Sequence, residues 1–273
     1  MRIGHNPNRQ NYTKTLAPIV LSVVTHLPDE VGYHSRRMEV IEFCFQTMLR
    51  GAQMDISLAV WDNGSNDRLL NYLQDSIKPD ILIRSQNIGL TSAKASLFGM
   101  LPEDTIVAYS DDDMLFYPDW LRPQIALLNG FPNVASVTGY PVRTAFRWGT
   151  ENTIKWATHN GAEYGRFLPQ KWEDDFAVSI GRDPAWHREY TREDLDYRIE
   201  YRGLKAYLTS HHCQFVARAG VARKAARYDG KAMADERYFD IELDKLGLRL
   251  ATQQRLTRHI GNVLHDELRK EIV

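Results

Sequence analysis

The segment SDDDMLFYPDW, residues 110–120, places three aspartates side by side directly before apolar residues. Two carboxylates 4 Å apart repel by about 1 kcal/mol in water and by about 4 kcal/mol at an effective dielectric of 20. A cluster that is even partly buried therefore needs a counter-charge, and a divalent cation is the obvious candidate. In an extended segment Asp111 and Asp113 would share one face and Asp112 would lie on the other, because side chains alternate with period two. Mg²⁺ or Mn²⁺ is often held by one or two carboxylates together with a substrate diphosphate.

The other interpretation of this cluster is a solvated acidic turn, or a helix N-terminus before Pro118 and Trp120 that the helix dipole stabilises. The order of an apolar strand, an acidic cluster and a helix favours a ligand site.

An α/β fold is indicated between Ile19 and Tyr140, where apolar runs of strand length alternate with segments of helical period. Such alternation is typical of βαβ units around a mainly parallel sheet. The predicted strands are 19–25, 56–61, 81–84, 105–110 and 134–140. The predicted helices are one carrying Met38, Ile41, Phe45 and Met48 and ended by Gly51, one capped by Ser65, and those at 91–101 and 119–130.

The sequence pattern changes after Tyr140, where charged residues are frequent and apolar residues no longer recur with a clear helical or strand period. We expect a more irregular half here, with two further helix-glycine-strand units that turn at Gly203 and at Gly247 and a short closing helix around Leu264 and Leu268. Four of the six tryptophans fall in this part, at Trp148, Trp156, Trp172 and Trp186.

Ligands of an open α/β sheet bind beyond the carboxyl ends of its strands. The first predicted strand ends at Thr25 and His26, the second runs into WDNGSND, and the third runs into SQNIG. Asp62 in the second motif could accept a hydrogen bond from an N–H of uracil or guanine. A turn followed by a helix cap would also explain its Asn, Gly, Ser and Asp residues.

The amino-acid composition limits the classes of function that this chain can have. The chain has 273 residues, 43% hydrophobic and 25% charged, which is typical of a globular protein with a sizeable core. Lys and Arg total 34 against 35 Asp and Glu, so no excess of positive charge predicts a nucleic acid as partner. We find no signal peptide and no run long enough to span a bilayer, and expect a cytoplasmic protein. Two cysteines, Cys44 and Cys213, predict neither a disulfide framework nor a zinc site.

Taken together, the first strand and the segments WDNGSND, NIGLTSAK and SDDDMLFYPDWL resemble the family 2 glycosyltransferases of the GT-A fold. The resemblance implies a single GT-A domain, 1–273, a three-layer sandwich in which 17–140 binds the nucleotide-sugar and 141–273 binds the acceptor and carries the catalytic base. It also implies a UDP- or GDP-sugar donor, a hydroxyl-bearing acceptor such as a carbohydrate, and Mn²⁺ or Mg²⁺ held by Asp111 and Asp113 of the Asp-x-Asp motif. The nucleotide-binding positions implied are Thr25, His26, Asp62, Asn63, Asn87, Gly89, Lys94, Asp111 and Asp112.

Family members also carry an acidic pair at the start of a helix, then a glycine, a strand and a histidine that completes the metal site. Asp235 and Glu236, followed by Gly247 and His259, resemble this arrangement and are favoured as catalytic residues because they reproduce all of its parts. The rival pair is Glu193 and Asp194, with His211 and His212 as alternative ligands. A third possibility lies in Glu173, Asp174 or Asp175.

The expected reaction is direct displacement with inversion at the anomeric carbon. The metal stabilises the departing diphosphate, and a carboxylate removes the proton of the acceptor hydroxyl. Trp148, Trp156, Trp172 and Trp186 could offer flat faces to a sugar ring or simply pack a core. A catalytically inactive nucleotide-sugar or carbohydrate-binding protein of the same fold is the alternative. A P-loop nucleotidase is excluded because the chain has no G-x-x-x-x-G-K-[ST] segment.

Overall fold

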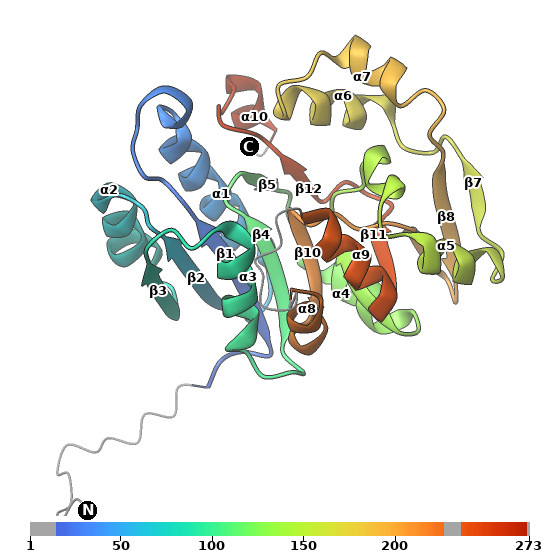
Figure 1. Cartoon of the computed structure of the whole chain (residues 1–273), viewed down its shortest axis with the longest axis horizontal. Coiled ribbons are helices and arrows are strands. Elements are labelled where there is room, and N and C mark those ends of the chain that lie inside the picture. Colours follow the sequence, from blue (N-terminus) through green and yellow to red (C-terminus); the bar gives the residue numbers. More distant parts are fainter. Residues whose placement is uncertain (1–14, 227–235, 272–273) are drawn as a thin grey trace, which may run out of the picture.

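One ten-stranded sheet forms the centre of the protein, and helices cover both of its faces (Figure 1). This computed structural model describes residues 15–226 and 236–271. The strands stand in the order β3-β2-β1-β4-β10-β6-β11-β9-β8-β7, and β5 and β12 form a separate two-stranded sheet. The strands are β1 (Ile19–Thr25), β2 (Ser57–Asn63), β3 (Ile81–Ser85), β4 (Ile106–Asp111), β5 (Met114–Phe116), β6 (Val134–Thr138), β7 (Glu163–Gly165), β8 (Asp196–Tyr201), β9 (Leu204–Tyr207), β10 (Gln214–Arg218), β11 (Leu248–Thr252) and β12 (Thr257–His259).

The predicted α/β architecture is confirmed, with a sheet that is parallel at one end and mixed at the other. β1 pairs in parallel with β2 and β4, and β2 pairs in parallel with β3. β10 was not predicted, and it runs antiparallel between β4 and β6. Through β10 a segment late in the sequence joins the first half of the sheet to β6 and β11, which are again parallel.

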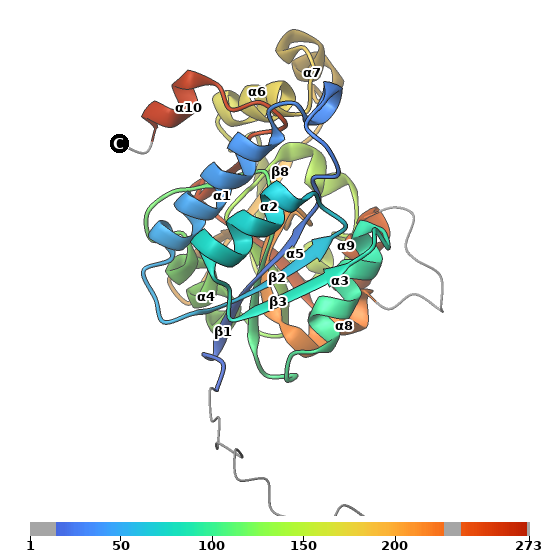
Figure 2. The ribbon, with the colours of Figure 1, turned by 90° about the vertical axis from the view of Figure 1, so that its left-hand side faces the viewer.

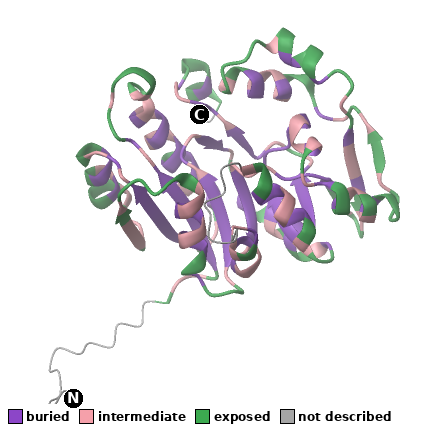
Figure 3. Ribbon diagram, in the orientation of Figure 1, coloured by how far each residue is buried: buried purple, intermediate pink, exposed green. Residues whose placement is uncertain are grey.

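The sheet is covered by two helical layers, shown edge-on in Figure 2. Leu21 and Val23 face a core with α1 and α4, while Val20 and Val24 face a second core with α3, α8 and α9. Figure 3 shows the central strands buried, as a near-continuous apolar run requires when both faces are covered. The helices are α1 (Arg37–Ala52), α2 (Asp67–Asn71), α3 (Leu90–Gly99), α4 (Leu121–Gly130), α5 (Glu151–Thr158), α6 (Gln170–Ser179), α7 (Pro184–Tyr190), α8 (Ala219–Ala226), α9 (Glu236–Leu246) and α10 (Asp266–Lys270), with 3₁₀ turns at Gly32–His34 and Arg143–Arg147 and a π-helical turn at Tyr72–Ile77.

The helix predicted before Gly203 is wrong, because a β-hairpin takes its place. β8 and β9 are joined by the two residues Arg202 and Gly203, with φ values of 50° and 80°. Positive φ at both central positions is what a two-residue hairpin turn of type I′ requires. The helix predicted before Gly247 is confirmed as α9, and the closing helix as α10.

Two predicted helix boundaries are also corrected. Gly51 lies within α1, and Gln53, with a φ of 49°, ends the helix. Gly51 is needed for packing instead, because an added Cβ would lie 2.8 Å from the carbonyl oxygen of Tyr117. Asn66 caps α2 by accepting from the Leu69 N–H, a role predicted for Ser65.

Among the described residues no helix combines the length with the apolar composition that crossing a bilayer would demand.

Candidate active site

A cavity of about 420 Å³ opens where β1, β2 and β4 end, and it extends to the loop that follows β3. These strands are parallel, so their carboxyl ends meet at one edge of the sheet, where α/β proteins bind ligands. Asp111, Asp112 and Asp113, which we call the acidic triplet, line this cavity. His26, Asn63, Asn87, Gly89 and Arg37 line it as well.

The acidic triplet is a turn and not an extended segment, since β4 ends at Asp111 and the next two residues turn into β5. The expectation that Asp112 would face away from the other two is therefore wrong. Arg37, the first residue of α1, donates from Nη1 to Asp113 Oδ2 at 2.9 Å and binds Asp112 Oδ1 through Nη2. A third contact, from Nη1 to Asn262 Oδ1 at 3.0 Å, fixes the guanidinium. Arg37 thus supplies part of the counter-charge that the sequence demanded.

The two aspartates bound by Arg37 titrate differently. Burial raises the pKa of Asp112 to about 6 although Arg37 opposes the shift. Burial alone would raise the pKa of Asp113 too, but the charges of His259 and Arg37 outweigh it and hold that pKa well below its usual range. Of the two aspartates bound by Arg37, Asp113 therefore has the lower pKa.

Asp111 has a different set of partners. Its Oδ1 accepts from the hydroxyl of Tyr109 at 2.6 Å and lies 3.4 Å from Nζ of Lys94. Lys94 is buried, contacts Oε1 of Glu236 and lies 4.5 Å from the centre of the Tyr109 ring. We expected Lys94 to contact the nucleotide, but its ammonium is engaged by the two carboxylates. Burial raises the pKa of Asp111.

His259 meets the acidic triplet because β12 pairs with β5. Its Nε2 lies 3.4 Å from Asp113 Oδ2, and its Nδ1 lies 2.8 Å from the hydroxyl oxygen of Ser179. Ser179 gives its one hydroxyl hydrogen to the carbonyl of Phe176 at 2.8 Å, so His259 Nδ1 must carry the hydrogen of the second bond. Nε2 is then left to face the carboxylate, where it holds a proton or a metal ion.

These donors suit a divalent cation. Oδ1 of Asp113 is buried without a hydrogen-bond partner, and Oδ2 of the same carboxylate lies 3.4 Å from Nε2 of His259. Carboxylate oxygen and imidazole nitrogen are ligands that Mn²⁺ accepts, and a second-shell hydrogen bond such as that from Ser179 is usual for a metal-bound histidine. Asp111 is held further away, because among the described residues the ligand atoms of Asp111, Asp113 and His259 do not all lie within 4.8 Å of one another.

His26, Asn63 and Asn87, three of the positions expected to bind the nucleotide, line the cavity and are linked to one another by hydrogen bonds. His26 Nδ1 donates to the Asn63 carbonyl at 2.9 Å, and the Asn63 amide donates to Asn87 Oδ1 at 3.2 Å. The Gly89 N–H donates to the same oxygen at 2.9 Å. Three loops that follow different strands are thereby tied into one wall.

Thr25 and Asp62 lie beneath this wall and are fully buried. Asp62 Oδ1 accepts from the Ser65 N–H at 3.0 Å, which is the turn that the alternative interpretation predicted. Its Oδ2 has no hydrogen bond and lies 3.7 Å from Nε of Arg84, and the Thr25 hydroxyl also has no partner. Neither residue is among those that line the cavity in the described part of the chain.

Of the favoured acidic pair, the structure describes Glu236, while Asp235 lies outside the described residues. Glu236 is the first residue of α9, and its Oε2 lies 3.4 Å from Nε2 of His212. Burial alone would raise the pKa of Glu236, but Lys94 and His212 outweigh it and lower that pKa. The ammonium of Lys94 therefore links the carboxylate of Glu236 to that of Asp111.

The rival acids are engaged elsewhere. Asp194 pairs with Arg147 at 2.7 Å, and Glu193 is exposed and pairs with Arg192 at 2.8 Å. Neither contacts the acidic triplet, so the structure does not bring this pair to the site. The third set is also paired, Glu173 with the N–H of Arg143, Asp174 with Arg188, and Asp175 with Arg255 and Arg258.

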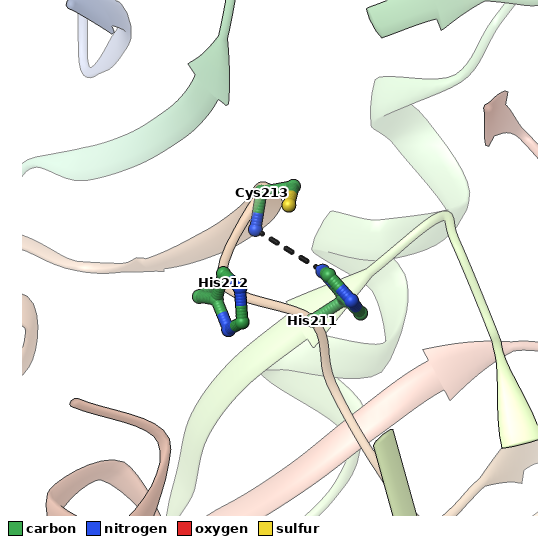
Figure 4. A group of neighbouring side chains, drawn as sticks. All are labelled: His211, His212 and Cys213. Carbon is green, nitrogen blue, oxygen red and sulfur yellow. Dashed lines mark hydrogen bonds between the residues drawn. The ribbon is translucent and has the colours of Figure 1, made fainter. Parts of the chain in front are cut away.

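His211, His212 and Cys213 lie at the start of β10 and are drawn in Figure 4. Their ligand atoms lie within 4.8 Å of one another, the closest such group of His, Cys, Asp and Glu in the described part of the chain. However, His211 Nδ1 accepts from the Cys213 N–H at 3.3 Å, and His212 Nδ1 donates to Asp240 at 2.8 Å. Burial raises the pKa of the Cys213 thiol, which disfavours the thiolate that a metal needs.

The four tryptophans do not line the cavity in the described part of the chain. Trp156 and Trp172 are partly buried and pack against the larger core, which is the second of the two roles that the sequence left open. Trp148 and Trp186 are 46% and 52% exposed, and Trp186 stacks on Tyr190 with 4.9 Å between ring centres.

The sequence model of the family described as Glycosyl transferase family 2 matches residues 34–191, more than half of the chain. The chain belongs to glycosyl transferase family 2. Its mixed α/β sheet is the GT-A fold that the sequence resemblance implied. The match includes α1 with Arg37, the wall residues Asn63, Asn87 and Gly89 and the acidic triplet, but it begins after His26 and ends before Glu236 and His259.

Two solved structures that the comparison matches to this chain are distant from it in sequence. A crystal structure of GalNAc-T7 with UDP, GalNAc and Mn²⁺ shares 14% identity and a TM-score of 0.48, over 91% of this chain and 46% of that one. A protein from Desulfovibrio desulfuricans, provisionally described as a nucleotide-diphospho-sugar transferase, shares 14% identity and a TM-score of 0.34, over 45% of this chain and 58% of that one. The chain thus spans about half of the length of these two proteins. Among curated proteins none matches it by sequence.

Three of the site's residues were missed by sequence reasoning, namely Arg37, Ser179 and His212 as a partner of Glu236. Arg37 left a signal, because a cation at a helix N-terminus opposes the helix dipole and indicates an anion nearby. Ser179 and His259 are separated by 79 residues of sequence, and nothing local marks their contact.

Proposed function

We propose that this family 2 glycosyltransferase moves a sugar from a UDP- or GDP-sugar to a hydroxyl acceptor with inversion, assisted by Mn²⁺ or Mg²⁺. The observation that carries the proposal is the cavity of about 420 Å³, which is lined by the polar residues His26, Asn63 and Asn87 together with the acidic triplet. Its size and mixed lining suit a nucleoside diphosphate.

The residues that would hold the metal are Asp113 and His259, with Asp111 as the third expected ligand. When bound, the ion acts as a Lewis acid that stabilises negative charge on the departing nucleoside diphosphate. Arg37 lines the same cavity and can contribute a second positive charge to that end. His26, Asn63 and Asn87 would orient the nucleobase, whereas Asp62, which the resemblance assigns to the base N–H, is fully buried and does not line this cavity.

Glu236 is the proposed base. In an inverting displacement the acceptor oxygen attacks the anomeric carbon from the face opposite the bond to phosphate. The C–O(phosphate) electron pair leaves with the diphosphate, and the acceptor's proton passes to the carboxylate. Lys94 and His212 keep Glu236 ionised, which a base requires. The exposed rings of Trp148 and Trp186 are candidates to support the acceptor.

The test is donor turnover. Purified protein is incubated with UDP- and GDP-sugars, with Mn²⁺, with Mg²⁺ and with chelator, and release of the nucleoside diphosphate is measured. Metal-dependent hydrolysis or transfer supports the proposal. Binding of a nucleotide-sugar without turnover supports an inactive binding protein instead. The contact of Lys94 with Glu236 favours that alternative, because it engages one oxygen of the proposed base. Neither binding nor turnover contradicts both.

Ser179→Ala is expected to weaken Mn²⁺ binding by roughly 10- to 100-fold, the usual cost of removing a second-shell partner of a metal-bound histidine. The substitution removes the acceptor of the His259 Nδ1–H bond and frees the ring to rotate. Titration calorimetry with Mn²⁺ and UDP measures the effect without any turnover. Ser76→Ala, the same change at an exposed position, is the control. An unchanged Mn²⁺ affinity in Ser179→Ala would remove His259 from the metal site.

A further inference from the structure

Three side chains next to the acidic triplet form a line of carboxylate, imidazole and carboxylate. His212, just before β10, lies with Nε2 3.4 Å from Glu236 Oε2 and with Nδ1 2.8 Å from Asp240 Oδ2. Glu236 and Asp240 are four residues apart on α9 and so share one face of that helix. A single imidazole therefore bridges two acids of the same helix.

The Asp240 end of this line is rigid. Asp240 Oδ1 lies 2.6 Å from Nη2 of Arg249, and both residues are buried. Arg249 is itself fixed, because its guanidinium also donates to Trp148 O at 2.8 Å and to Gly149 O at 2.5 Å. With Asp240 held in place, the hydrogen on Nδ1 of His212 is fixed and Nε2 is directed at Glu236.

The Glu236 end carries the carboxylate that the proposed reaction uses. Lys94 contacts Oε1 and His212 faces Oε2, so the two oxygens are held from different sides. A distance of 3.4 Å is long for a hydrogen bond, but catalytic contacts are commonly long without substrate and shorten in the reacting complex. Burial would lower the pKa of His212, yet the charges of Asp240 and Glu236 outweigh it and raise that pKa, which favours a proton between the ring and Glu236.

We infer that His212 is a positioning residue for Glu236, which it orients toward the acceptor hydroxyl from the fixed point provided by Asp240 and Arg249. The inference rests on the proposed function, since it needs Glu236 to be the base. It also gives a reason why His212 does not serve as a metal ligand with His211 and Cys213: both of its ring nitrogens face carboxylates.

Two substitutions at His212 separate orientation from structure. In His212→Asn the amide nitrogen takes the place of Nδ1, so the contact with Asp240 is kept and the contact with Glu236 is lost. In His212→Gln the amide reaches the place of Nε2 and restores a donor to Glu236. Displacement of a reacting group by about 1 Å costs up to roughly 100-fold. We therefore expect kcat to fall by roughly 10- to 100-fold in His212→Asn with KM for the donor little changed, and to recover in large part in His212→Gln.

A double-mutant cycle with Glu236→Gln completes the test. If His212 acts through Glu236, adding His212→Asn to Glu236→Gln should cost little beyond the single Glu236 change. His159→Asn, at an exposed histidine, is the matched control and should leave kcat unchanged. Thermal unfolding of each variant shows whether a loss of kcat comes from a loss of fold.

The outcomes are distinct. Wild-type kcat in His212→Asn overturns the inference, as do equal losses in His212→Asn and His212→Gln or fully additive losses in the cycle. A wild-type protein that turns over no UDP- or GDP-sugar overturns the proposed function itself, and the inference with it. A kcat loss confined to His212→Asn, with no further loss in the Glu236→Gln background, supports it.

Discussion

Replacing Asp113 by asparagine is expected to lower metal-dependent turnover by roughly 1000-fold while the chain remains folded. Asp113 has the lower pKa of the two aspartates at Arg37, its Oδ1 has no hydrogen-bond partner, and its Oδ2 faces His259. An amide in its place removes one negative charge from the metal site. The several kcal/mol that a bound metal contributes to transition-state stabilisation correspond to a factor of this size.

The fold should survive because Arg37 keeps Asp112 as its partner when Asp113 is neutral. Mn²⁺ affinity in the presence of UDP, kcat/KM for the donor and the unfolding midpoint are the three measurements. Asp55→Asn, the same substitution at an exposed loop position, is the control and should change none of them. Near wild-type Mn²⁺-dependent kcat/KM in Asp113→Asn would show that the acidic triplet does not hold the catalytic metal.

The first half of the sheet could be predicted from the sequence because its signals are local. The run 19–25 is mostly apolar on both faces and lies between Pro18 and His26, and the observed strand β1 has the predicted limits. β10 was missed because five residues, Gln214–Arg218, carry no alternation that distinguishes a strand from a loop. Its place between β4 and β6 is decided by pairing with those strands, which is not written in the segment itself.

The candidate site likewise has a part that the sequence predicted and a part that it did not. Positions that directly follow a strand, such as His26, Asn63 and the acidic triplet, were predicted because parallel strands bring their ends together. The counter-charge was expected from a metal alone, whereas Arg37 supplies part of it from a helix 74 residues earlier in the sequence than Asp111. The expectation that Asp112 would face away from Asp111 and Asp113 failed because it assumed an extended backbone, and the turn is set by the pairing of β5 with β12.

Substitution of Glu236 by glutamine is expected to lower kcat by roughly 10²- to 10⁴-fold, the usual contribution of a general base. Glutamine has the size of glutamate but cannot accept the proton of the acceptor hydroxyl. Lys94 would retain Asp111, 3.4 Å away, as a counter-charge, and His212 would retain Asp240. The local structure should therefore persist, and UDP with Mn²⁺ should bind with nearly unchanged affinity, measured by calorimetry, because Glu236 does not line the nucleotide cavity.

The comparison that decides the assignment is Glu193→Gln, the same chemical change in the rival pair. Glu193 is exposed and paired with Arg192, so its substitution should leave kcat unchanged. If Glu193→Gln lowers kcat and Glu236→Gln does not, the base has been assigned to the wrong acid. Asp235→Asn, measured beside them, separates the two members of the favoured pair. A base at Glu236 requires that most of the loss follow Glu236, whose carboxylate Lys94 and His212 hold ionised beside Asp111.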